Sequence, residues 1–189
     1  MNAVRGEVNT EINRTRRGAN RHAAPSTIGT SQQRRSIRVH SIDSKLVATV
    51  SLAITMLAVT TAIHHEALRR LSRAASGRRV THHGVILILA ALVSVHLAEI
   101  ALYACAFAAG ANVFGLGSLR GSSGNAALEF FYFAAETYST LGYGDLVPVG
   151  ALRVVASVEA PNGLMLLSWS GAFLFGVLDR DGRAHKERR

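Results

Sequence analysis

The sequence is poor in cysteine and in charged residues. A single cysteine, Cys105, stands among 189 residues, so no disulfide within the chain and no cysteine-based metal site can form. Only 17% of residues are charged, whereas 49% belong to the hydrophobic set and the mean hydropathy is positive. This composition is unusual for a soluble domain of this length, and it favours a membrane protein with a single domain.

Acidic residues are also scarce. They number 12 against 21 Lys and Arg, which gives a formal net charge of +9. The basic residues collect at the N-terminus, in residues 69–79 and in the C-terminal tail, next to apolar segments. This placement is typical of anchors that touch membrane lipids, and it argues against nucleic acid as a partner.

Residues 1–44 contain few large apolar side chains, and they hold eight Arg against three acids. The segment cannot bury enough apolar surface to fold alone, so we expect a disordered basic tail. One interpretation is an arm that touches anionic lipid. The other is a solvated tail that exists partly because the start codon was placed too far upstream.

Three apolar segments are candidates for membrane-spanning helices. The first, Leu46–Ile63, has 18 uncharged residues, and as a helix it measures ~27 Å. A signal peptide is the rival interpretation, but the apolar run is long for one and the basic segment before it is much longer than usual. The ranges expected are a first helix with a cytoplasmic extension at 45–72, a basic cytoplasmic loop at 73–84, an outer helix at 85–109, an inner helix at 151–178 and a basic tail at 179–189.

The chain between the second and third apolar segments begins with the Gly- and Ser-rich residues 115–124. The next segment, 125–139, is partly apolar but too short to cross a bilayer. Asn125 is a good N-cap and Glu129 lies in the first turn, so a short helix that enters the membrane and turns back is expected. The predicted fold is therefore an all-α membrane protein with three transmembrane helices plus a re-entrant pore helix at 125–139 and a filter loop. Cys105 is expected to serve helix packing.

The filter loop is the sequence Thr-Leu-Gly-Tyr-Gly-Asp at residues 140–145, called the filter segment below. A dehydrated cation needs a ring of oxygens in place of its water, and backbone carbonyls supply one if successive carbonyls point the same way. Such alignment requires unusual dihedral angles at alternate residues, which glycine tolerates. Gly142 and Gly144 have that spacing.

The side chains of the filter segment have separate expected roles. Thr140 adds a hydroxyl oxygen at the inner end, Tyr143 points outward as a packing spacer, and Asp145 marks the outer mouth. The C-terminal end of the preceding short helix carries partial negative charge, which favours a cation on the pore axis.

With these residues the chain resembles the potassium channel family with a helix–pore loop–helix core, over about residues 85–178. The segments His64–Leu68, His96–Glu99 and Gly115–Leu119 are similar to those of small bacterial ion channel proteins with one additional N-terminal helix. The resemblance implies a homotetramer around a central pore. It also implies ion-binding oxygens in a filter, with the positions Thr140, Leu141, Gly142, Tyr143 and Gly144.

The resemblance assigns further positions. Glu136 is expected behind the filter, paired with Asp145. Gly163 falls where many members have a gating hinge, and Pro161 should kink the same helix. Three residues depart from the common pattern: Leu141 replaces Val or Ile, and Tyr132 and Phe133 stand where some members have tryptophan.

Ionisable groups at membrane depth are costly, and they usually face protein or water. His96 and Glu99 are three residues apart and share a helix face. They could form a polar pair that fixes helix packing, a pH-sensitive latch, or part of a metal site. For a metal site the further histidines that lie near in sequence are His64, His65, His82 and His83. Glu159 could line the cavity or pair with a neighbouring helix.

The expected topology leaves one conflict. A family-like filter faces outward, so residues 64–84 and 179–189, with five basic residues each, lie in the cytoplasm. With one more helix before the pore, the basic N-terminal tail must then lie outside, against the positive-inside rule. A misplaced start would remove much of this tail, and a first segment that only lies in the interface would let the tail stay inside.

The function expected from the sequence is passive, potassium-selective conduction in a cell membrane, with a bacterial inner membrane the expected location. Such a channel subunit is not an enzyme. It has no catalytic residues, no organic substrate and no cofactor, and K⁺ is its permeant ion. Its partners are copies of itself and membrane lipids. No apolar helix carries the regularly spaced Arg of a voltage sensor. Two alternatives are a non-conducting or weakly selective relative that acts as an interaction protein, and a membrane metal protein using His96, Glu99 and Glu159.

Overall fold

The computed structural model describes residues 27–75, 81–121 and 126–186, and the side chains within 44–75, 81–121 and 127–179. The chain divides into two compact units, Met1–Ile42 and Asp43–Arg189, and the arrangement described below is that of the second unit. The elements are α2 (Thr27–Ala75), α3 (His82–Asn112), β1 (Gly117–Arg120), α4 (Ala126–Tyr138), β2 (Val147–Gly150) and α5 (Leu152–Lys186).

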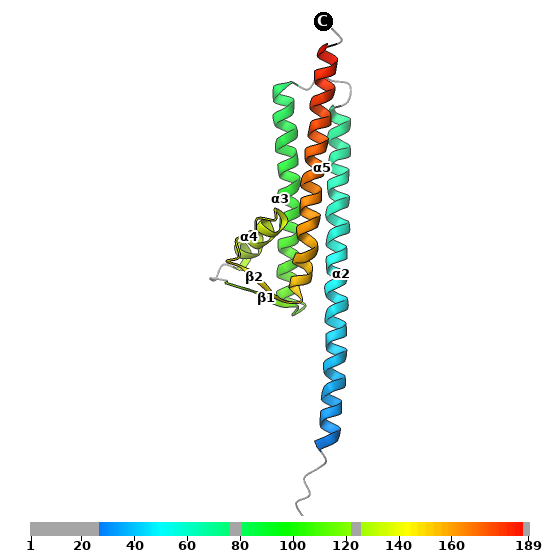
Figure 1. Ribbon diagram of the computed structural model, residues 1–189, viewed down its shortest axis with the longest axis vertical. Helices are drawn as coiled ribbons and strands as arrows, with labels where there is room; N and C mark the ends of the chain where they lie inside the picture. The colour runs from blue at the N-terminus through cyan, green and yellow to red at the C-terminus, as the bar shows by residue number, and fades with distance from the viewer. Residues whose placement is uncertain (1–26, 76–80, 122–125, 187–189) are drawn as a thin grey trace, which may run out of the picture. The chain divides into compact units, whose positions relative to one another are not determined.

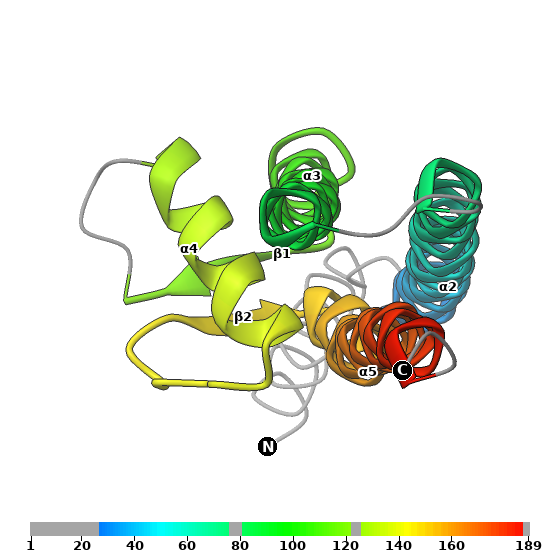
Figure 2. The same cartoon turned by 90° about the horizontal axis from the view of Figure 1, so that it is seen from above.

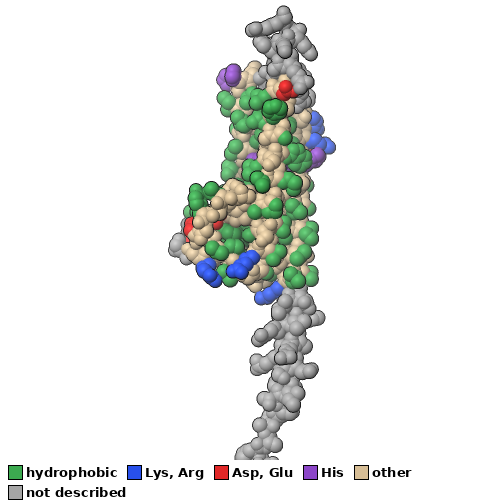
Figure 3. Space-filling view, in the orientation of Figure 1, with side chains coloured by type: hydrophobic (Ala, Val, Ile, Leu, Met, Phe, Trp, Pro, Cys, Tyr) green, Lys and Arg blue, Asp and Glu red, His purple; other side chains and the backbone are tan. Residues whose placement is uncertain are grey.

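Three helices are long and apolar enough to cross a membrane: Ser44–Ala75 within α2, His82–Asn112, and Leu152–Asp179 within α5. Their outward side chains are largely apolar, as with Ile54, Leu87 and Phe175, which are 60%, 69% and 73% exposed. Figure 3 shows hydrophobic side chains spread along the described helices, with Lys and Arg mainly toward the ends. The all-α membrane fold expected from the sequence is confirmed.

The expectation of a disordered tail over residues 1–44 is wrong for residues 27–44, because α2 begins at Thr27. Adding residues to an existing helix fixes few dihedral angles per hydrogen bond gained, so a polar segment can continue a membrane helix at little cost. Residues 1–26 lie outside the described residues. The same applies at the other end of the chain, where α5 runs through Lys186 into the expected tail.

Two short strands were not expected from the sequence. β1 and β2 pair antiparallel, with Gly117 opposite Gly150 and Arg120 opposite Val147. The segment before α4 is rich in Gly and Ser, which are poor helix formers, and extended pairing satisfies its backbone groups instead. Because α4 and the filter segment lie between the two strands in sequence, the sheet holds both ends of the pore loop together.

In the second unit, α3 and α5 lie between α4 and α2 (Figures 1 and 2). The short helix α4 lies against α3 and α5 on one side, while α2 runs along the opposite side. Aromatic side chains fill the contact of α4 with α3, where the rings of Phe107 and Phe133 meet edge to face at 4.9 Å. The fully or almost fully buried members of this core are Tyr103, Phe107, Ala134, Tyr138, Leu152, Val155 and Leu166.

Within the second unit, α2 contacts the other helices and the loop after α3 from Lys45 to Leu68. Lys45 Nζ donates to the carbonyl oxygen of Gly115, at 3.2 Å. Leu52 and Met56 pack on the main core, and Leu68 joins a second apolar cluster with Ile88, Leu92 and Val177. The helix therefore lies beside the pore domain through the apolar run, which favours a spanning segment over one that only lies in the interface.

Two polar residues of α5 are buried, one with hydrogen-bond partners among the described residues and one without. Asn162 donates to Thr60 Oγ1 at 2.8 Å and to Tyr103 Oη at 3.0 Å, so it ties α5 to α2 and α3. Glu159 is fully buried too, yet within the described residues neither carboxylate oxygen has a hydrogen-bond partner. Of the two roles expected for Glu159, neither lining an open cavity nor pairing with a described helix is seen in this single chain.

Gly163 is needed because α5 and the end of α4 approach closely. A Cβ atom built at Gly163 would lie 2.2 Å from the carbonyl oxygen of Tyr138 and 2.8 Å from its ring. By contrast, a Cβ at Gly171 would meet nothing within 4 Å. Close packing against Tyr138, at the end of α4, therefore explains Gly163 without any hinge motion. Pro161 is accommodated inside a continuous α5.

We predict that Gly163→Ala destabilises the protein, because the new methyl group must displace the Tyr138 backbone. Overpacking of this kind costs about 1–3 kcal/mol. The measurement is the melting temperature of the purified protein in detergent. Gly171→Ala is the matched control and should leave the melting temperature nearly unchanged. Equal effects of the two substitutions would contradict the close packing.

Substitutions of Asn162 and Glu159 should affect the free energy of unfolding differently. Asn162→Leu removes the donor to both Thr60 Oγ1 and Tyr103 Oη, which should lower the free energy of unfolding by about 1–3 kcal/mol. Glu159→Leu removes an unpartnered buried polar group, so it should raise this free energy or leave it unchanged. Thermal unfolding followed by circular dichroism checks both, and destabilisation by Glu159→Leu as large as that by Asn162→Leu would show that Glu159 has a partner.

Candidate functional site

The filter segment adopts left-handed backbone conformations at every second residue. The φ angles are +59° at Thr140, +56° at Gly142 and +80° at Gly144. Alternation of this kind is what turns successive carbonyls of an extended chain toward the same side, as a ring of cation ligands requires. Glycine adopts positive φ at no steric cost, whereas Thr140 is the one described non-glycine residue with a positive φ.

The end of α4 holds the filter segment through backbone hydrogen bonds. The carbonyl oxygen of Glu136 accepts from the amides of Leu141 and Gly142, at 2.8 and 3.2 Å, and that of Thr137 accepts from Thr140 at 3.0 Å. The start of the filter is therefore fixed to the C-terminal end of the helix. This is the end that carries the partial negative charge of the helix dipole.

The side chain of Glu136 has a different partner from the one expected. Its Oε2 atom accepts from the backbone amide of Tyr143 at 3.1 Å, while Asp145 Oδ1 accepts from the amide of Leu146 at 3.0 Å. Among the described residues no hydrogen bond joins Glu136 to Asp145. In this chain the Glu136 carboxylate therefore supports the filter segment at the backbone amide of Tyr143.

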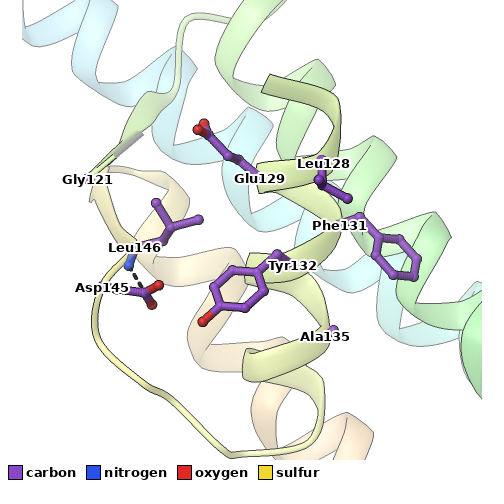
Figure 4. A pocket seen from close by; sticks show the side chains of 8 residues that line it. All are labelled: Gly121, Leu128, Glu129, Phe131, Tyr132, Ala135, Asp145 and Leu146. Carbon is purple, nitrogen blue, oxygen red and sulfur yellow. Dashed lines mark hydrogen bonds between the residues drawn. The ribbon is translucent and has the colours of Figure 1, made fainter. Parts of the chain in front are cut away.

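Aromatic stacking supports the outer half of the filter. The rings of Tyr132 and Tyr143 lie parallel at 6.3 Å with an interplanar angle of 7°. Phe133, next to Tyr132, is buried in the core at 3% exposure, so only Tyr132 takes the bracing position that the resemblance suggested for both. Figure 4 shows the Tyr132 hydroxyl directed toward Asp145, and both residues line a hollow of about 440 Å³. This hollow is lined by Gly121, Leu128, Glu129, Phe131, Tyr132, Ala135, Asp145 and Leu146.

The filter segment is open to its surroundings in the single chain. Leu141 is 56% exposed and Tyr143 is 68% exposed, and residues 139–145 are all exposed. A non-helical backbone at membrane depth is tolerated only where protein buries it or water reaches it. At that depth the exposed segment would therefore have to contact further protein or line a water-filled path.

A second group of polar residues lies behind the filter, among the helices. Glu99 is fully buried, and its carboxylate lies 3.1 Å from His64 Nδ1 and 3.3 Å from His96 Nδ1. The Tyr138 hydroxyl donates to Glu99 Oε2 and lies 2.9 Å from His96 Nδ1. Ser170 Oγ completes the group, 3.0 Å from His96 Nε2 and 3.3 Å from His64 Nε2. We call these five residues the histidine cluster.

The structure shows which of the candidate histidines lie beside His96 and Glu99. His64 is fully buried and joins His96 and Glu99, whereas His65, His82 and His83 are exposed and outside the cluster. The three-residue spacing of His96 and Glu99 correctly placed them on one face. Tyr138 and Ser170 were not anticipated as partners, because they stand 39 and 74 residues from these groups and no local pattern links them. Cys105, expected to pack between helices, is instead exposed.

Comparisons with known proteins identify the pore region. Residues 90–179 match the family model described as "Ion channel". The voltage-gated potassium channel Kch of Escherichia coli (strain K12) is 42% identical over 53 residues. That match covers 28% of this chain and 13% of the relative, so it concerns a small part of that protein. No solved structure matches the chain.

The matched family region contains α3 from residue 90 onward, α4, the filter segment and α5 up to residue 179, which are the elements that a pore loop requires. An ion channel family indicates transport rather than enzymatic catalysis, and the three membrane-capable helices make the protein multi-pass. The chain is therefore a multi-pass membrane protein whose residues 90–179 form a helix–pore loop–helix region of the ion channel family, of the potassium channel type, with one further helix before it.

Proposed function

We propose that this protein is the subunit of a homotetrameric, potassium-selective channel that conducts passively through the filter segment. The observation that carries the proposal is the alternation of positive φ angles at Thr140, Gly142 and Gly144. It supports a row of carbonyl oxygens that faces one axis. Leu141 and Tyr143 contribute carbonyls to the same row, and Thr140 adds its hydroxyl.

Assembly into a ring follows from the exposure of the filter segment. The carbonyl row of one chain offers a cation only one side of a cage, whereas four copies around an axis supply a complete ring of oxygens. Exposed apolar side chains beside the filter, such as Leu128 at 62% and Leu141 at 56%, would pack against the neighbouring subunit. No organic cofactor or substrate is needed, because K⁺ itself is the ion that the oxygens bind.

The membrane orientation follows from the same proposal. With the mouth at Asp145 outside, Arg69, Arg70 and Arg73 near the end of α2 lie on the cytoplasmic side, as the positive-inside rule requires. Lys45 lies at the outer end, since it contacts Gly115 between α3 and β1. A bacterial inner membrane suits such a protein. A non-conducting relative with the same fold is the second candidate, and flux measurements decide between the two.

The first test of the proposal is selective ion flux. Purified protein in liposomes should carry K⁺ in preference to Na⁺, and Gly142→Ala should abolish this preference, because a Cβ at φ +56° costs about 1–2 kcal/mol per subunit and turns the carbonyl row. The measurement is K⁺ and Na⁺ flux by ion-selective fluorescence or in a planar bilayer.

Gly171→Ala is the control for flux, since a Cβ there meets nothing within 4 Å. It should conduct like the unaltered protein. Flux that is absent in the unaltered protein under every condition would contradict conduction and support the interaction protein. Flux that is equal for K⁺ and Na⁺ would contradict selectivity alone.

The second test is subunit number. Native mass spectrometry of the detergent-solubilised protein should give complexes of four chains, because four copies close a ring around one axis. Gly142→Ala should keep this number, since the substitution alters the carbonyl row and leaves the packing helices intact. A monomer or dimer as the largest stable species would contradict a shared filter.

A further inference from the structure

The histidine cluster joins all four helices, and ion conduction through the filter segment does not account for it. His64 comes from α2, His96 and Glu99 from α3, Tyr138 from the end of α4, and Ser170 from α5. His64 and Glu99 are fully buried, Tyr138 is 1% exposed and Ser170 is 7% exposed. A group of this polarity within the apolar part of a membrane protein is expensive, so its contacts should balance in protons and charge.

The protons of the cluster do not balance when Glu99 is ionised and both imidazoles are neutral. Five contacts each need one proton. They link the His64 ring to Glu99, the His96 ring to Tyr138, Tyr138 to Glu99, and each Nε2 atom to Ser170. The two neutral imidazole rings and the hydroxyls of Tyr138 and Ser170 supply one proton each, which makes only four. One contact therefore lacks a donor, and the cluster keeps the negative charge of Glu99, which attracts a cation.

We propose that the cluster binds a divalent transition-metal ion of the zinc class, with His64 Nδ1, His96 Nδ1 and a carboxylate oxygen of Glu99 as ligands. One ligand atom from each of these residues lies within 4.8 Å of the others. His64 Nδ1 lies 3.1 Å from Glu99 Oε1, and His96 Nδ1 lies 3.3 Å from the other carboxylate oxygen, Oε2. Ligands ~2.0–2.1 Å from a tetrahedral zinc ion are separated by roughly 3.3 Å, so the spacing of His64 and Oε1 suits an ion, and the His96 ring must shift toward Oε1 to complete the set.

The remaining two residues fit the role of supporting groups. Metal-bound histidines usually donate the other ring N–H to an acceptor, which fixes the tautomer. Ser170 Oγ faces both Nε2 atoms and has two lone pairs, so it can accept from both rings. Tyr138 continues to donate to the second oxygen of Glu99. With the metal in place three of the contacts remain, and the two ring N–H groups and the Tyr138 hydroxyl supply one proton to each.

The donor set indicates which ions are preferred. Two imidazole nitrogens and one carboxylate oxygen suit Zn²⁺ and its neighbours in the first transition row, whereas Ca²⁺ and Mg²⁺ prefer oxygen ligands throughout. His96 keeps 12% exposure of its side chain, while His64 and Glu99 keep none, so an ion would enter past His96. The bound ion would attach α2 to α3 directly beside Tyr138, the last residue of α4 before the filter segment.

The test uses the full-length, untagged protein in detergent, stripped with a chelator and then loaded with Zn²⁺ or Co²⁺. Bound zinc is measured by elemental analysis after desalting, and cobalt by its visible absorption, which is intense for tetrahedral coordination. The unaltered protein should retain one ion per chain. His64→Gln and Glu99→Gln should each weaken binding by at least about tenfold. Neither readout depends on ion conduction.

His65→Gln is the matched control, because it removes the neighbouring exposed imidazole and leaves the cluster intact. It should bind like the unaltered protein. Should His64→Gln fail to fold, Ser170→Ala decides in its place, since it keeps all three ligands. Affinity lowered about tenfold by Ser170→Ala supports the site, and unchanged affinity overturns it. The proposal is also overturned if the unaltered protein retains no ion, in which case a proton balances the cluster, or if His65→Gln loses as much metal as His64→Gln.

Discussion

A backbone that leaves the helical conformation inside a bilayer must find other hydrogen-bond partners or water, and the rest of this structure depends on that constraint. The filter segment meets it in two ways. Its first amides bond to the carbonyls of Glu136 and Thr137, and the amide of Tyr143 bonds to the Glu136 side chain. Its carbonyls would remain for the cations and water of the proposed filter. The helix α4, the two strands and the close approach at Gly163 all serve to keep this exposed stretch of chain in one place.

The two sides of the bundle are held by different forces. On the side of α4 the contacts are aromatic and aliphatic, as between Phe107 and Phe133. On the side of α2 many contacts are polar, from Lys45 at one end through Thr60 to His64. Apolar surface gives no net driving force between helices in lipid, whereas hydrogen bonds across helices remain favourable there. The additional helix therefore depends on a few directional contacts, which fix its rotation and its level beside α3 and α5.

Much of this arrangement could be predicted from the sequence, and the limits have physical causes. Long apolar runs predicted the three spanning helices, and the spacing of Gly142 and Gly144 predicted alternate dihedral angles, because both signals are local. Contacts between distant segments were not predictable: nothing near His64 distinguishes it from His65, and the partner of Glu136 depends on how far its side chain reaches. The strands were missed because four-residue extended segments leave almost no periodic pattern.

The pairing of β1 with β2 has a consequence for how sequences of this type can diverge. The register from Gly117 opposite Gly150 to Arg120 opposite Val147 cannot slip by one residue without exchanging the buried and exposed faces of both strands. An inserted or deleted residue between the strands must therefore be accommodated within the loop that joins them. The helix α4 and the filter segment cannot accommodate it, because both are fixed by hydrogen bonds and packing. Among related sequences, length should therefore vary in the connection between residues 121 and 126 rather than in α4 or the filter segment.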